Sequence, residues 1–205
     1  MPSHALAPNL RWRPEALLGM AMVAARPIAA GEPLSISYGP KSNTELLADY
    51  GFCLDANPYD CTEIRLPAWP PGHPCAQAAE ELGTALEGGG RAFRVRAAEN
   101  HAAARDLWAW LRLGALPPDE TDGDPAALLR AARAGALDAA SERRARAMLA
   151  QACDERLAEF AGPVSEDEQL LLQDGLPGDL RQVVRTRLGE KRLLLHYRAL
   201  ARQPV

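Results

Sequence analysis

The sequence predicts an α+β chain in which a strand-forming N-terminal segment precedes an all-helical segment. Short apolar runs separated by glycine and proline occupy residues 1–66. Four prolines then fall within the dense breaker cluster at 67–74. Beyond this cluster the chain is rich in Ala, Leu, Arg and Glu, which form helices readily. We therefore predict a first domain over 1–66, a linker over 67–73 and an all-α domain over 74–205.

Composition limits the classes of function. Hydrophobic residues make up 47% of the chain and aromatic residues 5%, so a core built mainly from Leu, Ala and Val is expected. The net charge of −4 argues against nucleic-acid binding, which usually requires a basic excess. No apolar run reaches the roughly 18 residues that a membrane span needs. The N-terminus also lacks the basic and apolar regions of a signal peptide.

The cysteines suggest ordinary thiols rather than a metal centre. None of Cys53, Cys61, Cys75 and Cys153 forms a CxxC pair. A structural zinc site usually draws its ligands from closely spaced pairs, and the grouping of these cysteines with His73 matches that pattern only loosely. We predict reduced thiols and no metal site.

The first segment contains signals for three strands. Leu18–Arg26 is an apolar run suited to a buried strand. Pro27–Glu32 provides a turn, and Leu34–Tyr38 is a second strand that ends before Gly39 and Pro40. Thr62–Leu66 alternates between apolar and polar residues, as a third strand would.

A short helix is predicted between the second and third of these strands. Ser42 or Asn43 is suited to the N-cap of a helix over Thr44–Tyr50, because a short polar side chain can accept a bond from the first turn. Gly51 is a natural C-terminal stop, since glycine adopts the left-handed conformation without strain.

The helical segment begins with a predicted helix over Pro74–Glu87 that stops at a glycine linker, 88–90. Ala92–Val95 is expected to be extended. A helix over Ala102–Leu113 carries apolar residues at helical spacing, and 117–123 is expected to be a loop.

Three further helices are predicted toward the C-terminus. They cover Pro125–Gly135, Ser141–Phe160 and Pro177–Ala201. Between the last two, Ser165 and Glu168 fit a capping box. The last helix is expected to bury one apolar stripe: Leu180, Val183, Val184, Leu188, Leu194 and Leu195. Its arginines are expected to be mostly solvated: Arg181, Arg185, Arg187 and Arg192.

Two motifs point to a known family. The run from Gly31 to Phe52 reads as a turn, a strand ending in a tyrosine, a polar loop and a short helix ending in Tyr-Gly-Phe. It closely resembles the C-terminal catalytic half of a SET domain of the Rubisco large-subunit lysine methyltransferase type. The acidic run 166–168, followed by Arg-Leu-Gly-Glu-Lys at 187–191, resembles the end of the helical substrate-binding domain of that family. The resemblance implies a partial SET β-fold followed by an all-α substrate-binding domain.

The resemblance implies methyl transfer from S-adenosyl-L-methionine to a lysine of a protein substrate that the helical domain binds. Tyr38 matches the catalytic tyrosine, which also contacts the cofactor, and its alternative role is that of a core tyrosine. Tyr50 matches a residue of the substrate-lysine pocket, and Phe52 matches the ring that packs on the cofactor adenine. Simple packing roles are the alternatives for both. Tyrosine suits such a site because its apolar body carries a hydroxyl that can orient an amine.

The N-terminal residues match the family less well. Ser3 and His4 fall on an Asn-His pair that contacts the cofactor, and serine cannot supply the paired donor and acceptor of an amide. The N-terminal half of the SET domain is not found in the sequence. We therefore expect a C-terminal fragment of a methyltransferase that is inactive alone, in the cytoplasm or the chloroplast. The alternatives are a non-catalytic protein-binding module and a purely structural helical bundle.

Overall fold

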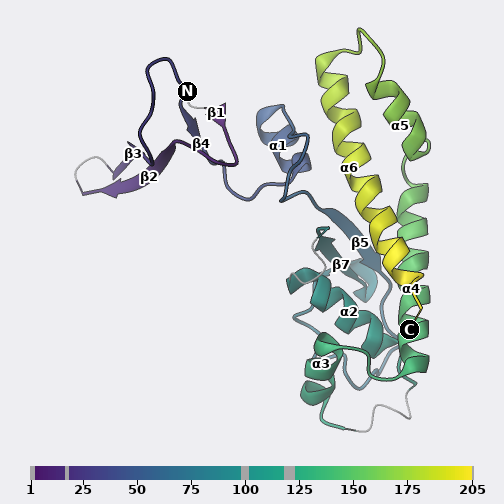
Figure 1. Ribbon diagram of the computed structural model, residues 1–205. Coiled ribbons are helices and arrows are strands. Elements are labelled where there is room, and N and C mark those ends of the chain that lie inside the picture. The colour runs from purple at the N-terminus through teal and green to yellow at the C-terminus, as the bar shows by residue number, and fades with distance from the viewer. Residues whose placement is uncertain (1–2, 17–18, 98–101, 118–122, 205) are drawn as a thin grey trace. The chain divides into compact units, whose positions relative to one another are not determined.

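A computed structural model describes residues 3–16, 19–97, 102–117 and 123–204. The chain forms two compact units, Met1–Lys41 and Ser42–Val205. Strands dominate the first unit, and the second combines a small sheet with helices (Figure 1). The predicted α+β class is therefore confirmed.

The first unit contains two small sheets. In one, β1 (Ser3–His4) pairs in parallel with β4 (Ser35–Ile36). In the other, β2 (Leu10–Glu15) pairs antiparallel with β3 (Gly19–Ala24). The strand predicted over Leu18–Arg26 is thus observed as β3, with Leu18 outside the described residues, but the predicted burial is wrong because the side chains of β3 are exposed or half-buried. The strand predicted over Leu34–Tyr38 is shorter than expected.

The β2–β3 hairpin has one apolar face. Alternate residues of a strand point to the same side, so Trp12 and its register partner Met22 share a face with Met20. Each of these three side chains is about half exposed. Leu10, at the end of the same face, is buried.

The second unit is organised around a three-stranded antiparallel sheet. Its strand order is β5 (Thr62–Leu66), β7 (Arg91–Val95), β6 (Thr84–Ala85). Thr62 is the register partner of Val95 in the antiparallel β5–β7 pair. The predicted strands over 62–66 and 92–95 are therefore both observed, and they are neighbours.

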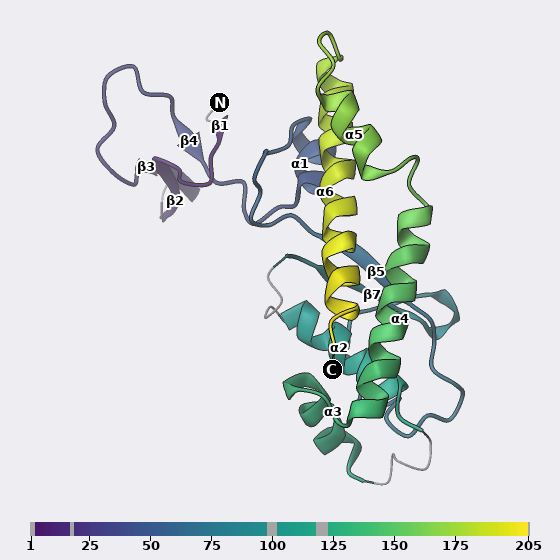
Figure 2. The same ribbon diagram turned by 45° about the vertical axis from the view of Figure 1, so that its right-hand side comes forward.

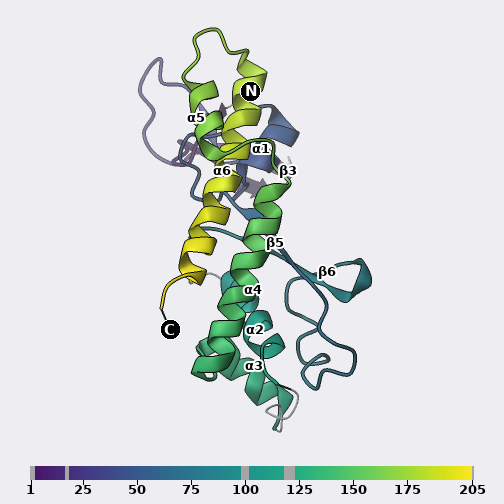
Figure 3. The ribbon, with the colours of Figure 1, turned by 90° about the vertical axis from the view of Figure 1, so that its right-hand side faces the viewer.

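Besides α1, which is described below, the described part of this unit contains the following helices: α2 (Ala102–Gly114), α3 (Pro125–Ala134), α4 (Ala139–Ala158), α5 (Val164–Leu171) and α6 (Gly178–Ala201). Helices α4 and α6 pack side by side, and α5 lies against α6 (Figures 2 and 3). Helix α2 contacts β7, α3 and α4. In the described part of the chain, none of these helices is both long and apolar enough to cross a membrane.

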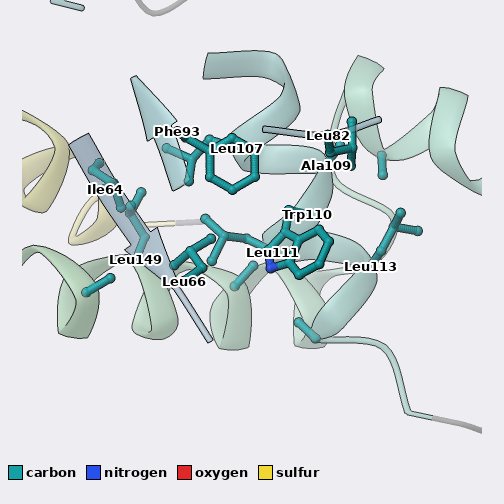
Figure 4. Close-up of a cluster of buried hydrophobic side chains, with 14 of the residues drawn as sticks. Ile64, Leu66, Leu82, Phe93, Leu107, Ala109, Trp110, Leu111, Leu113 and Leu149 are labelled. Atoms are coloured by element: carbon teal, nitrogen blue, oxygen red, sulfur yellow. The ribbon is translucent and has the colours of Figure 1, made fainter. Parts of the chain in front are cut away.

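The core of the second unit joins the sheet to α2 and α4. Figure 4 shows side chains from β5, β7, α2 and α4 converging on one cluster. Ile64, Phe93 and Leu149 are each at most 1% exposed. Because helices cover one face of this sheet, the apolar side chains on that face are almost fully buried, whereas the Trp and Met side chains of the β2–β3 hairpin are about half exposed.

Helix α1 (Asn43–Tyr50) begins and ends as its sequence predicts. The Ser42 hydroxyl accepts a hydrogen bond from the Glu45 amide, and the Glu45 carboxylate accepts one from the Ser42 amide at 2.8 Å. This reciprocal pair is a capping box. Gly51 ends the helix at φ 76°, in the left-handed region that favours glycine.

The helix predicted over Pro74–Glu87 is wrong: these residues form turns, β6 and the start of the short 3₁₀ helix η1 (Glu87–Gly89). Gly83 explains the failure. Its φ is +62°, and a Cβ there would lie 2.7 Å from the Ala92 carbonyl oxygen. The end of this segment packs against β7 through Gly83 and the β6–β7 pairing, and this tertiary contact overrides the helical propensity of the segment. The predicted linker at 88–90 forms part of η1 and the turn that enters β7.

Other boundaries also differ from prediction. Helix α5 starts at Val164 with Pro163 as its N-cap, so Ser165 lies inside the first turn and caps nothing. Leu180 and Val183 are 46% and 47% exposed, which corrects the predicted stripe at its N-terminal end. Most of the loop predicted over 117–123 lies outside the described residues.

Candidate functional site

The predicted site residues of the first unit are brought together by β1 and β4. The Ser3 amide donates to the Leu34 carbonyl at 3.1 Å, and the Ala5 amide donates to the Ile36 carbonyl at 3.0 Å. This parallel pairing places His4 beside Tyr38, although the two residues are 34 positions apart in the sequence. Their ring centroids are 5.1 Å apart and their planes are inclined by 48°.

A hydrogen bond fixes the His4 ring against the backbone of Tyr38. The Tyr38 amide donates to Nδ1 of His4 at 3.1 Å. Because Nδ1 accepts this bond, it carries no proton, and the neutral ring holds its proton on Nε2. Burial lowers the pKa of His4, which favours the same neutral form. The backbone that carries Tyr38 is thereby tied to a neutral imidazole.

Ser3 is exposed, and its backbone amide serves the β1–β4 pairing. A serine hydroxyl cannot supply the paired donor and acceptor of an asparagine amide. The role predicted for Ser3 in cofactor binding stays a prediction.

Asn9 holds the beginning of β4, a role that the sequence did not reveal. Its side chain is 1% exposed and accepts a bond from the Ser35 amide at 2.8 Å. Its Nδ2 donates to the Pro33 carbonyl at 2.8 Å and to the Glu32 carboxylate at 3.0 Å. A buried asparagine with all of these partners fixes the strand from which Tyr38 follows.

Glu32 joins this arrangement as an anion. The Arg26 guanidinium, the Asn9 side chain and the Ala29 amide all bond its carboxylate and lower its pKa to about 2. The turn before β4 is therefore closed by a charge-assisted hydrogen bond over the whole neutral pH range.

The remaining predicted site residues, Tyr50 and Phe52, lie at the end of α1 in the second unit. Their ring centroids are 6.3 Å apart with planes inclined by 45°. Tyr50 is 47% exposed and Phe52 is half-buried. Two neighbouring aromatic rings thus offer apolar faces to a ligand, which is what an adenine or an alkyl chain would contact.

The start of α1 is held by a network around Asn43. The Asn43 amide donates to the Asp60 carboxylate at 3.0 Å. The Asn43 side chain accepts from the Leu54 amide at 2.9 Å and donates to the Leu54 carbonyl at 2.9 Å. Asn57 donates to the same side chain at 3.1 Å. Burial raises the pKa of Asp60. Asn43 therefore fixes α1 against the segment that follows Phe52.

Helix α6 contacts this region at several points. Thr44 donates to Glu190 at 2.9 Å, and the Cys53 amide donates to Gln182 Oε1 at 3.1 Å. A Cβ at Gly189 would lie 2.7 Å from the Asp60 carboxylate, so glycine at this position allows the close approach.

The two C-terminal sequence motifs meet in one buried ion cluster. Lys191 Nζ donates to Asp167 at 2.7 Å and to the carbonyls of Ala161 and Gly162 at 3.0 and 2.8 Å. Asp167 and Lys191 are at most 1% exposed. Arg187 donates to both oxygens of Asp167, which corrects its predicted solvated role. The acidic run at 166–168 and the motif at 187–191 thus join α5 to α6.

A pocket of about 710 Å³ lies between the 54–60 segment and α6. Asn43, Asp60, Arg185 and Gly189 line part of it. Across the described residues, no group of three or more His, Cys, Asp or Glu side chains gathers as a metal ion would require.

Comparison with known proteins identifies the helical part of the chain. A sequence model of the family described as Rubisco LSMT substrate-binding matches residues 75–194, more than half of the chain. This chain belongs to that family. The matched range runs from the turns before β6 to the middle of α6, and it includes the Asp167–Lys191 cluster.

Solved structures of Rubisco LSMT have the same fold as this family member. A crystal structure of the SET domain of LSMT bound to lysine and AdoHcy matches 98% of the chain at 21% identity, with a TM-score of 0.74. A structure of Rubisco LSMT bound to sinefungin and monomethyllysine matches 89% of the chain at 22% identity, with a TM-score of 0.69. The chain spans less than half of either structure, 48% and 44% respectively.

A curated relative gives a more local match. The ribosomal lysine N-methyltransferase set10 of Schizosaccharomyces pombe is 46% identical to the chain over 43 residues. The match covers 21% of the chain and 8% of the relative. Together these findings confirm that the chain is related to SET-domain lysine methyltransferases of the Rubisco LSMT type.

Proposed function

We propose that the protein to which this chain belongs transfers a methyl group from S-adenosylmethionine to a lysine of another protein. The observation that carries the proposal is the contact between His4 and Tyr38, two residues 34 positions apart to which the resemblance assigns roles in the site. The relation to lysine methyltransferases and the AdoMet-bound structure of Rubisco LSMT support the choice of cofactor.

The side chains of this chain suit that chemistry. S-adenosylmethionine supplies an electrophilic methyl group, which a neutral amine must approach in line. The Tyr38 hydroxyl would orient the amine, and the neutral His4 ring would hold the backbone of Tyr38. Tyr50 would line the lysine pocket, and Phe52 would pack on the adenine. Ser3 and His4 would contribute to the cofactor site.

We propose that the 205-residue chain alone transfers little or no methyl. The resemblance implies a glycine-rich cofactor loop, and the sequence offers no counterpart among the strands of the first unit. The helical unit would bind the protein substrate, as the family description suggests.

The test is methyl transfer by the protein that contains this chain, with Tyr38→Phe as the variant. We expect turnover to fall about hundredfold, because the amine loses the group that orients it. The dissociation constant for S-adenosylmethionine should change little, since the ring remains. Unchanged turnover would remove Tyr38 from the mechanism. A folded wild-type protein that neither binds the cofactor nor transfers methyl would refute the proposed function.

A second candidate is a non-catalytic protein-binding module. It is favoured by one observation: the family match lies entirely within Ser42–Val205, the unit that has its own hydrophobic core. Affinity capture with the whole chain as bait, followed by direct binding of each captured protein, tests this candidate. A chain that transfers no methyl but binds one partner with a defined dissociation constant supports it. Absence of any saturable partner would contradict it.

A further inference from the structure

We propose that Gln182 of α6 is a positioning residue for Phe52, because it holds the backbone of the adjacent Cys53. The role of Phe52 at the cofactor rests on the proposed function. The anchoring itself is a property of this chain and can be tested without cofactor.

One side-chain oxygen of Gln182 accepts two hydrogen bonds from Cys53. The Cys53 amide donates to Oε1 at 3.1 Å, and the Cys53 thiol donates to the same atom at 2.7 Å. Cys53 is 9% exposed, so water has little access to replace these bonds. An amide left unpaired in such surroundings is costly, which makes the acceptor at 182 important.

The chemistry of the two residues is complementary. Burial raises the pKa of the Cys53 thiol, so the thiol stays protonated and can donate. The Gln182 backbone is itself held, because its carbonyl accepts from the Thr186 hydroxyl at 3.0 Å one turn later. The acceptor therefore sits on a regular part of α6 rather than on a loop.

The two ends of α1 are held by different residues of α6. Near its N-terminus, Thr44 bonds Glu190 and the Asn43–Asp60 pair lies against Gly189. Just beyond its C-terminus, Cys53 bonds Gln182. Loss of Gln182 should therefore release the residues around Phe52 while the start of α1 keeps its contacts.

Amide hydrogen exchange resolved by NMR tests the anchoring in the chain itself. The variants are Gln182→Leu, which keeps the size but removes the acceptor, and Gln182→Glu, which keeps an acceptor. Arg198→Gln is the matched control, because it breaks a 2.8 Å contact of α6 with Asp154 on α4. In Gln182→Leu we expect the Cys53 amide to exchange about tenfold faster, in line with one lost hydrogen bond.

Exchange at 43–48 should stay unchanged in Gln182→Leu, and Gln182→Glu should restore protection of Cys53. Arg198→Gln should leave Cys53 protected. Equal protection of Cys53 in wild type and Gln182→Leu would overturn the inference. So would faster exchange throughout α1 in every variant, which would indicate general destabilisation.

Steady-state kinetics of the protein that contains this chain give a second readout. We expect Gln182→Leu to raise the KM for S-adenosylmethionine about tenfold and to leave the KM for the acceptor lysine unchanged. Equal increases in both constants would contradict a specific effect on Phe52. A wild-type protein without cofactor binding would refute the proposed function, and the exchange data would still decide whether Gln182 anchors Cys53.

Discussion

The two units of this chain use the same type of pairing with very different results. The β2–β3 hairpin and the β5–β7 pair are both antiparallel and almost equal in length. In the hairpin, Trp12 and Met22 remain about half exposed. In the β5–β7 pair, Ile64 and Phe93 are at most 1% exposed because helices cover that face. An isolated two-stranded ribbon is only marginally stable, whereas a sheet of three strands that packs against helices is stable by itself.

Each unit is held together internally by a different kind of interaction. His4 and Tyr38 belong to the unit with little core, and they are held by hydrogen bonds such as those of Asn9. The second unit derives its stability from apolar burial and from the Asp167–Lys191 cluster. Substitutions in the two units should therefore have different consequences for unfolding.

The largest expected effect is that of Phe93→Ala in the second unit. We expect the free energy of unfolding to fall by about 3–5 kcal/mol, because a buried aromatic ring is replaced by a cavity. Urea denaturation followed by circular dichroism measures this loss. The matched variant in the first unit, Met22→Ala, should cost less than about 0.5 kcal/mol because the side chain is already half exposed. Equal losses would break the comparison.

Lys191→Met should have the next largest effect. The change keeps the volume but leaves the buried Asp167 with Arg187 alone, and we expect a loss of about 3 kcal/mol. Arg192→Met is the control, since its pair with Glu168 is exposed and should contribute less than about 1 kcal/mol. Thermal and urea unfolding would distinguish the two. Similar losses for both variants would mean that burial of the cluster contributes nothing to stability.

The smallest expected effect concerns the capping box of α1. Its hydrogen bonds lower the pKa of Glu45 to about 2, below the 4.5 of a free side chain. The stabilisation is therefore complete above pH 4.5 and is lost as the pH falls toward 2. At pH 6, Glu45→Gln should cost about 0.5 kcal/mol, allowing for solvent screening of a partly exposed group. The difference from wild type should shrink at pH 3, and a constant difference would contradict this account.

Local signals in the sequence predicted local structure well. The α1 cap at Ser42 and the stop at Gly51 depend on contacts within one or two turns, and both are observed. Segment 74–87 fails because Gly83 adopts φ +62° against β7, a contact that only the tertiary structure provides. Ser165 fails because Pro163, two residues earlier, already sets the extended backbone at the start of α5.

The candidate site was partly visible in the sequence. The motifs pointed to Tyr38, His4, Tyr50 and Phe52, whose assigned roles stay predictions. The residues that hold them were not visible, since Asn9 and Gln182 act across 26 and 129 positions of sequence. Neither the periodicity of the sequence nor the spacing of its residues predicts which distant backbone a single Asn or Gln side chain will bind.

The pairing of β5 with β7 has a consequence for chimeric proteins. A junction in the proline-rich stretch after Leu66 would take β5 from one parent and β7 from another, so five register pairs would have to match across the two sequences. Among the described residues, a junction between Lys41 and Ser42 crosses no strand pairing, and it keeps the α1 contacts with α6 within one parent. Recombination of relatives should therefore succeed more often at the second position.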